Sequence, residues 1–157
     1  MDTLAIQDQL AAENHCFGCG PNNPDGLQIK SYWDGDETVC TFTPRPAHTA
    51  GPRHVLNGGI IGTIIDCHCI CTAIAATQRA EGRPFASEPH IWCVTRSLHL
   101  DYLKPTPIEA PAILRARIAA TEGKRTTVTC TLSSGGVERV RAQVVAVRVP
   151  SDWRAPG

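Results

Sequence analysis

The chain has 157 residues, 42% of them hydrophobic, and its 15 basic and 15 acidic side chains give a formal net charge of zero at pH 7. This length and apolar content suit one domain with a core of its own, and the balanced charge speaks against binding to nucleic acid or to an anionic membrane surface. We therefore predict a single domain over residues 1–157, with its core at about 16–149 and a poorly ordered tail at 151–157.

The N-terminal segment at residues 2–13 predicts at most a short, weakly amphipathic helix. It has no cationic region followed by an apolar stretch, so we expect no signal peptide and a cytoplasmic location. In that compartment the eight cysteines are expected to be reduced thiols rather than disulfides.

Cys16 and Cys19 form a CxxC pair. A structural zinc site needs four ligands, and the sequence has no second CxxC or histidine pair at a matching spacing. Cys67 and Cys71 lie four residues apart, so they share one face of a helix and a long-range completion by these two is conceivable. The sequence alone favours packed thiols, and we expect no metal.

Two short strands precede the central part of the chain. Residues 18–26 are dense in turn-forming glycine, proline and asparagine. Residues 27–33 predict a first strand, 34–36 a turn, and 38–43 a second strand rich in β-branched side chains, which Pro44 ends.

A long apolar segment follows and predicts a helix from residue 58 to about 77. Its uninterrupted part, 60–76, is at the lower limit for crossing a membrane and carries Asp66 and His68 at its centre, which favours a buried core helix. His68 is two positions from Asp66 and so points to a different face, as a hydrogen-bonded core histidine would.

Asp66 needs a functional or structural reason, because an ionised group is costly to bury without a partner and no lysine or arginine lies between Arg53 and Arg79. Asn57 is a good helix N-cap, and Gly58 after it lets another group approach the free backbone N–H groups. The segment thus predicts an oxyanion-binding helix end followed, two turns on, by an acid.

The second half of the chain predicts four antiparallel strands, at residues 95–103, 112–119, 126–132 and 137–149. Six strands and one long helix make an α+β fold, a sheet with a helix on one face. The helix is apolar nearly all round, so the sheet must curl around it or a partner must cover it.

Three motifs occur in a fixed order along the chain. The first is the lead-in at residues 16–27, CFGCGPNNPDGL, the second is Asn57-Gly58-Gly59 followed by Asp66, and the third is LDYLKPTP at 100–107. Together they resemble the hotdog-fold acyl-CoA thioesterases, in particular the phenylacetate-pathway branch, in which the second motif has the pattern His-Gly-Gly…Asp. The resemblance covers about 16–149 and implies a curled sheet of about six strands around one long central helix.

The resemblance also implies a site. In that family the acid on the helix is nucleophile or general base, which corresponds to Asp66, and the backbone N–H after the histidine polarises the thioester carbonyl, which corresponds to Gly58. Asn57 stands where the family has histidine, so an amide replaces the imidazole. We expect an acyl-CoA thioesterase with acyl-CoA as substrate and no cofactor, active as a homodimer or a dimer of dimers.

Further residues are candidates for binding the substrate. They are Gly59 at the helix start, Thr63 one turn before Asp66, His54 in the loop before the helix, and Lys104. The Thr63 hydroxyl could hold the carboxylate of Asp66. Lys104 is a candidate for the phosphates of coenzyme A, together with Lys124 and Arg125 in a later turn. Two other functions stay open: a non-catalytic acyl-CoA- or lipid-binding hotdog module, and a hotdog acyl-thioester hydratase.

Overall fold

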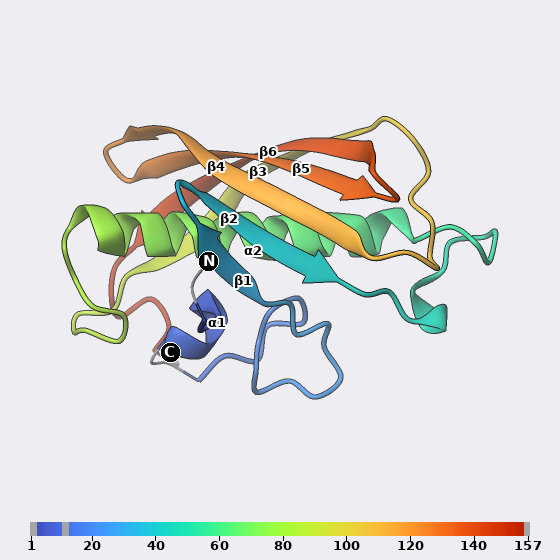
Figure 1. Ribbon diagram of the computed structural model, residues 1–157. Helices are drawn as coiled ribbons and strands as arrows, with labels where there is room; N and C mark the ends of the chain where they lie inside the picture. Colours follow the sequence, from blue (N-terminus) through green and yellow to red (C-terminus); the bar gives the residue numbers. More distant parts are fainter. Residues whose placement is uncertain (1–2, 11–12, 156–157) are drawn as a thin grey trace.

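The computed structural model describes residues 3–10 and 13–155, in which one antiparallel sheet curls over one long helix (Figure 1). The long helix is α2 (Gly58–Ala80), and two short helices are α1 (Ile6–Gln9) and the 3-10 helix η1 (Pro46–His48). The strands are β1 (Ser31–Asp34), β2 (Glu37–Phe42), β3 (Trp92–Tyr102), β4 (Ala112–Glu122), β5 (Arg125–Ser134) and β6 (Val137–Val149). This is the predicted α+β arrangement of six strands around one helix.

The strand order is β1-β2-β4-β5-β6-β3, so β3 is an edge strand that pairs only with β6. Its register with β6 shifts between Thr95 and Ser97, which leaves Arg96 as an extra residue in a β-bulge. Bulges of this kind bend a strand and re-aim its side chains, and they are frequent next to active sites.

Helix α2 is covered by the sheet on one side and by the N-terminal segment on the other (Figure 1). Ile61, Ile64, Ile65 and Ile74 are buried in the common core. By length and composition alone this helix could cross a membrane, but 61% of its most apolar window is buried inside the molecule. The packing is that of the core helix that the sequence predicts.

The first strand is shorter than the sequence predicts, because β1 begins at Ser31 rather than at residue 27. Gln28 has a φ of 50°, a left-handed conformation that a strand does not contain. Leu27 and Ile29 instead donate their backbone N–H groups to the carbonyls of Phe17 and Gly18. The segment is therefore bonded to the CxxC loop and not to the sheet.

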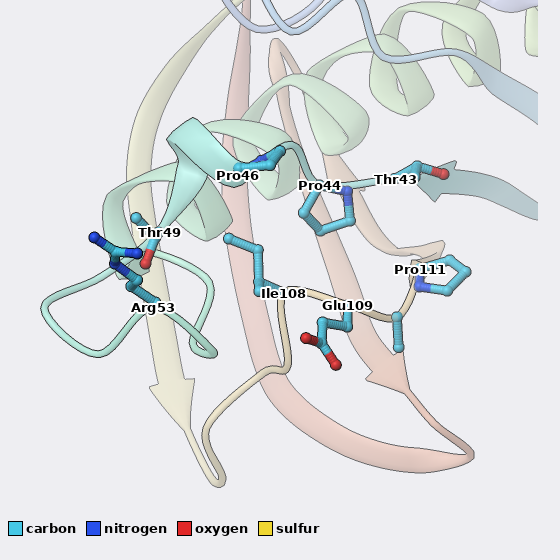
Figure 2. A pocket seen from close by; sticks show the side chains of 9 residues that line it. Thr43, Pro44, Pro46, Thr49, Arg53, Ile108, Glu109 and Pro111 are labelled. Atoms are coloured by element: carbon cyan, nitrogen blue, oxygen red, sulfur yellow. The ribbon is translucent and has the colours of Figure 1, made fainter.

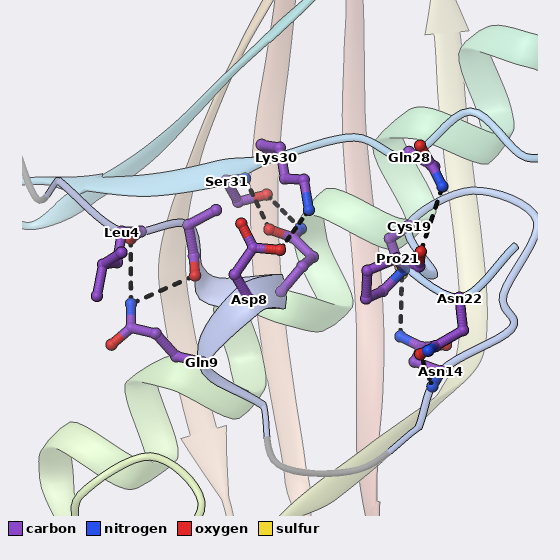
Figure 3. A network of polar contacts seen from close by, with 12 residues as sticks. Leu4, Asp8, Gln9, Asn14, Cys19, Pro21, Asn22, Gln28, Lys30 and Ser31 are labelled. Atoms are coloured by element: carbon purple, nitrogen blue, oxygen red, sulfur yellow. Dashed lines mark hydrogen bonds and ion pairs between the residues drawn. The ribbon is translucent and has the colours of Figure 1, made fainter. Parts of the chain in front are cut away.

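His68 is the core histidine that the sequence predicts. Its ring is fully buried, with Nδ1 2.8 Å from the Ser31 hydroxyl and Nε2 3.3 Å from the Thr38 hydroxyl. Burial lowers the pKa of this imidazole to about 4. The amide of Gln7 also bonds to Ser31, which is labelled in Figure 3. The network therefore ties α1 and β1 to the helix.

The C-terminal tail, which we expected to be poorly ordered, forms turns over residues 151–155. The Arg154 guanidinium lies 4.1 Å from the ring centroid of Trp92, a cation–π contact that docks the turn on the start of β3. The last two residues, 156–157, lie outside the described residues.

Candidate active site

Asp66 lies half-buried in the middle of α2, on the side that faces β3. Its Oδ1 accepts a hydrogen bond of 2.6 Å from the Thr95 hydroxyl, which comes from the residue just before the bulge. Burial raises the pKa of the Asp66 carboxyl above its usual value, and the Thr95 hydrogen bond partly opposes this. The carboxylate therefore has one oxygen held by the sheet.

Thr63 does not hold this carboxylate, although its position one turn earlier suggested it. Its hydroxyl donates instead to the carbonyl of Gly59 at 3.0 Å, the bond that threonine commonly makes within a helix. Thr95 takes the role, and the two partners are 29 residues apart along the chain. Thr95 was missed because no local pattern links a strand threonine to a helix acid.

The start of α2 has the predicted N-cap. The Asn57 Oδ1 accepts from the backbone N–H of Gly59 at 2.8 Å and of Ile60 at 3.2 Å, which satisfies two of the first four donors of the helix. The Gly58 N–H precedes these two and has no acceptor within the described residues. Asn57 itself is exposed, so its amide NH₂ also remains available to a ligand.

Tyr102, at the end of β3, fixes this helix end to the sheet. Its hydroxyl donates to the Gly58 carbonyl at 2.7 Å, and a Cβ added at Gly58 would lie 3.5 Å from its ring. A Cβ at Gly62 would likewise lie 3.4 Å from Leu100. Strand β3 thus packs against one face of the helix and supplies both Thr95 and Tyr102.

A cavity of about 350 Å³ lies at the helix start and brings together Gly58 and Lys104, two of the predicted site residues. Ile61 and Tyr102 also line it, whereas Asp66 does not. His54 is exposed in the loop before the helix and does not line it either. Within one chain, the predicted site residues are only partly brought together.

Figure 2 shows a second cavity, of about 520 Å³, that contains none of the predicted site residues. It lies between the end of β2 and the segment before β4, and its charged residues are Arg53 and Glu109.

Lys124 and Arg125 lie at the other end of the molecule. The Lys124 carbonyl accepts from the Arg148 N–H, and the Arg148 side chain pairs with Glu81, which caps the C-terminus of α2. Of the three predicted phosphate-binding cations, only Lys104 is near the N-terminus of the helix.

Asp66 and Gly58 are eight residues apart on one helix, which corresponds to about 12 Å along its axis. One carbonyl group cannot contact both within a single chain. Among the described residues, one group of thiols lies close enough together to hold a metal, Cys16, Cys19 and Cys67, and Cys67 directly follows Asp66 on α2.

Residues 67–148 match a family described as the acyl-CoA thioesterase N-terminal domain. Over 118 residues, 75% of this chain, the sequence is 27% identical to acyl-coenzyme A thioesterase THEM4 of Rattus norvegicus. The matched part is 45% of that protein, so the chain spans about half the length of this curated relative.

Among solved structures, a thioesterase superfamily protein of Shewanella loihica PV-4 is 35% identical, with a TM-score of 0.64 over 78% of this chain and 91% of its own. The E. coli PaaI protein from the phenylacetic acid degradation operon has the same fold at 13% identity, with a TM-score of 0.64 over 79% of this chain and 81% of its own. These likenesses confirm the hotdog fold and the resemblance that the sequence motifs carry.

Proposed function

The chain belongs to the family of the acyl-CoA thioesterase N-terminal domain, and we propose that it hydrolyses the thioester bond of an acyl-CoA at Asp66. The observation that carries this proposal is the setting of Asp66, a half-buried carboxylate with one oxygen bonded to Thr95 on a helix that begins with a free Gly58 N–H. A base and an oxyanion donor are the two groups that acyl transfer to water requires.

The proposed reaction follows from these two groups. The Asp66 carboxylate takes a proton from water while the water oxygen attacks the thioester carbonyl carbon, and the Gly58 N–H binds the developing oxyanion. When the carbon–sulfur bond breaks, coenzyme A leaves as a thiolate that receives the proton, and the free acid is the other product. In a variant of the same proposal, the Asp66 carboxylate itself attacks the thioester carbonyl and releases coenzyme A, and water then hydrolyses the acyl-Asp66 anhydride.

The distance between Asp66 and Gly58 supports a site shared by two copies of the chain. Strand β3 has one free edge and carries the exposed apolar side chains Leu98 and Tyr102. Two copies that pair along this edge would bring the carboxylate of one toward the helix N-terminus of the other. The proposal therefore includes a homodimer, or a dimer of dimers, and a cytoplasmic location, where thiols stay reduced.

Substrate binding is proposed for the helix start and the cavity beside it. Gly59, next to the donor Gly58, has no side chain to block the approach of the acyl group. Lys104 lines that cavity and is the cation best placed for a phosphate of coenzyme A. His54 and Thr63 have weaker support, because His54 lies outside the cavity and the Thr63 hydroxyl is bonded to its own helix.

One observation favours a second function, a non-catalytic acyl-CoA-binding module. Asn57 replaces the family's histidine, and its side-chain oxygen is used by the helix cap, so only its amide NH₂ remains for the substrate. A hydratase has less support, because that chemistry uses a histidine paired with the acid and the carboxylate of Asp66 is bonded to Thr95.

The experiment compares Asp66→Asn with the parent protein by coupling release of the coenzyme A thiol to a colour reaction, over a panel of acyl-CoAs. We expect kcat to fall by at least about 10²-fold, because the amide keeps the shape but cannot accept the proton. Asp36→Asn, in the exposed β1–β2 turn, is the matched control and should keep full activity.

Calorimetric titration with a non-hydrolysable acyl-CoA analogue should show unchanged binding by Asp66→Asn. If both proteins hydrolyse the best substrate equally fast, Asp66 is structural. If the parent protein binds acyl-CoA and hydrolyses none of the panel, the binding module becomes the function.

A further inference from the structure

The CxxC loop and the central helix bring a group of cysteine thiols together. The Sγ atoms of Cys16, Cys19 and Cys67 all lie within 4.8 Å of one another, and those of Cys16 and Cys67 are 3.5 Å apart. Cys71 is buried one helical turn beyond Cys67, on the same face of α2. Two cysteines from a loop thus meet Cys67 on a helix far away in the sequence, and Cys71 follows on the same helix face.

The loop is built to lie directly on the helix at this point. A Cβ added at Gly18 would lie only 2.3 Å from the Cys67 Sγ, so the residue just before Cys19 must be glycine for the loop to lie this close to the helix. The carbonyl of Gly18 accepts from Ile29, and that of the preceding Phe17 from Leu27. These bonds tie the loop to the segment at residues 27–29, so they fix its shape independently of the thiols.

Asn14 supports both ends of the loop and is itself 5% exposed. Its Oδ1 accepts from the backbone N–H of Cys16 at 3.0 Å, and its Nδ2 lies 3.9 Å from the Cys19 Sγ as a donor (Figure 3). A buried amide that donates a hydrogen bond to a sulfur stabilises the thiolate form, which is the form that binds a metal.

The geometry points to a structural zinc site formed by Cys16, Cys19, Cys67 and Cys71. Zinc bound tetrahedrally to thiolates at about 2.3 Å separates the sulfurs by about 3.8 Å. The Sγ atoms of Cys16 and Cys67 are 3.5 Å apart and that of Cys19 is within 4.8 Å of both, so three ligands are near this spacing, and Cys71 would complete the four. A disulfide needs about 2.05 Å and would join only two of them. The sequence alone favours packed thiols, but the fold brings the C-x2-C of the loop against Cys67 of the C-x3-C on the helix, and both spacings occur in structural zinc sites.

Zinc binding has a defined proton balance. Each thiol that forms a zinc–sulfur bond releases one proton to solvent, so four ligands release four protons and leave a site of net charge −2. The metal would tie residues 14–20 to the centre of α2. This inference does not depend on the proposed hydrolysis, since its readout is bound metal and not activity.

The experiment measures zinc in the full-length protein, purified with a reductant and without chelators, by mass spectrometry of the metal. We expect one zinc per chain. After exchange with Co²⁺, thiolate-to-cobalt charge-transfer bands in the near ultraviolet and intense visible bands should report tetrahedral sulfur ligation.

Two ligand variants and one control locate the site. Cys16→Ser and Cys67→Ser should each retain at least about tenfold less zinc than the parent protein after dialysis. Because Cys16 is exposed, Cys16→Ser should keep the fold, and circular dichroism checks this. Cys93→Ala, at a buried cysteine of β3 outside the group, should keep a full equivalent.

Three results would overturn the inference. The first is reduced parent protein that takes up no zinc when the metal is supplied. The second is a full equivalent of zinc, with unchanged cobalt spectra, in both ligand variants. The third is a Cys16–Cys67 disulfide in zinc-free protein prepared without air, which would make the group a redox pair.

Discussion

Asn57 is a residue at which stability and substrate contact can be separated. Its side-chain oxygen accepts from two backbone N–H groups of α2, while its amide NH₂ is free at an exposed position. The two roles use different atoms of one side chain. A substitution that keeps the oxygen and removes the nitrogen therefore tests the second role alone.

We expect Asn57→Ala to lower the free energy of unfolding by about 1 kcal/mol, the usual value of an N-cap, and to slow hydrolysis less than Asp66→Asn does. Asn57→Ser should keep the stability, because serine is a comparable cap, while losing any contribution of the amide NH₂. Urea unfolding and thioester hydrolysis measure the two effects. Equal activity of parent and Asn57→Ser would show that the amide does not contact the substrate.

The sequence predicts Asp66 as the central residue of the site because a carboxylate in an apolar helix is costly to bury without a partner or a function. It does not predict Thr95, which lies on a strand 29 residues away and reaches Asp66 only because α2 packs against β3. The contact between Tyr102 and Gly58 cannot be predicted for the same reason, because the two residues are 44 positions apart in the sequence. Contacts between elements depend on the register and crossing of those elements, which the local sequence pattern does not contain.

At the scale of elements, the CxxC loop contacts the helix so closely that Gly18 cannot carry a side chain. The Gly18→Ala Cβ would lie 2.3 Å from Cys67 Sγ and 3.0 Å from a Thr63 methyl carbon. We expect this variant to lose about 1–3 kcal/mol in the free energy of unfolding, the usual cost of overpacking.

Gly51→Ala is the matched control, because a Cβ there meets nothing within 4 Å and the residue lies in an exposed loop. Urea unfolding in the presence of a reductant should show Gly51→Ala within about 0.5 kcal/mol of the parent. If Gly18→Ala is as stable as Gly51→Ala, the loop does not rest on the helix as the structure has it.

Strands β4, β5 and β6 follow the alternation of the sequence over most of their length, because one face of each packs on the core and the other meets solvent. Edge strand β3 does not, because Leu98 and Tyr102 on its apolar face are exposed. The strand at residues 27–33 is a second exception. The alternation of apolar and polar residues is imperfect there, and no local sequence pattern predicts the left-handed conformation of Gln28. Its backbone hydrogen bonds go to the CxxC loop, a partner that only the folded chain supplies.

At the scale of the whole molecule, the free edge of β3 and the distance from Asp66 to Gly58 both lead us to expect a second copy. Light scattering at micromolar concentration should give about 34 kDa, twice the 16.9 kDa of one chain, or about 68 kDa for a dimer of dimers. A monomer of about 17 kDa would contradict the shared site.

Leu98→Lys should weaken this dimer, because a charge would then lie on the free edge strand, where Leu98 is 39% exposed. Ile113→Lys is the control, at a side chain 42% exposed on β4, which is flanked by a strand on each side. Only Leu98→Lys should shift the molecule toward the monomer and lower hydrolysis with it.

The strand order also decides when a growing chain can fold. Within the described residues strand β3 pairs with β6 alone, and β6 is made after β4 and β5, so β3 leaves the ribosome before its partner exists. Helix α2 is synthesised earlier still, and its apolar side chains that face the sheet stay exposed to water until β4, β5 and β6 have been made. Pairing over such sequence distances is slow and exposes a chain to aggregation. We therefore expect the need for a chaperone to be greatest before β3 pairs with β6, and to end when that pairing completes the sheet.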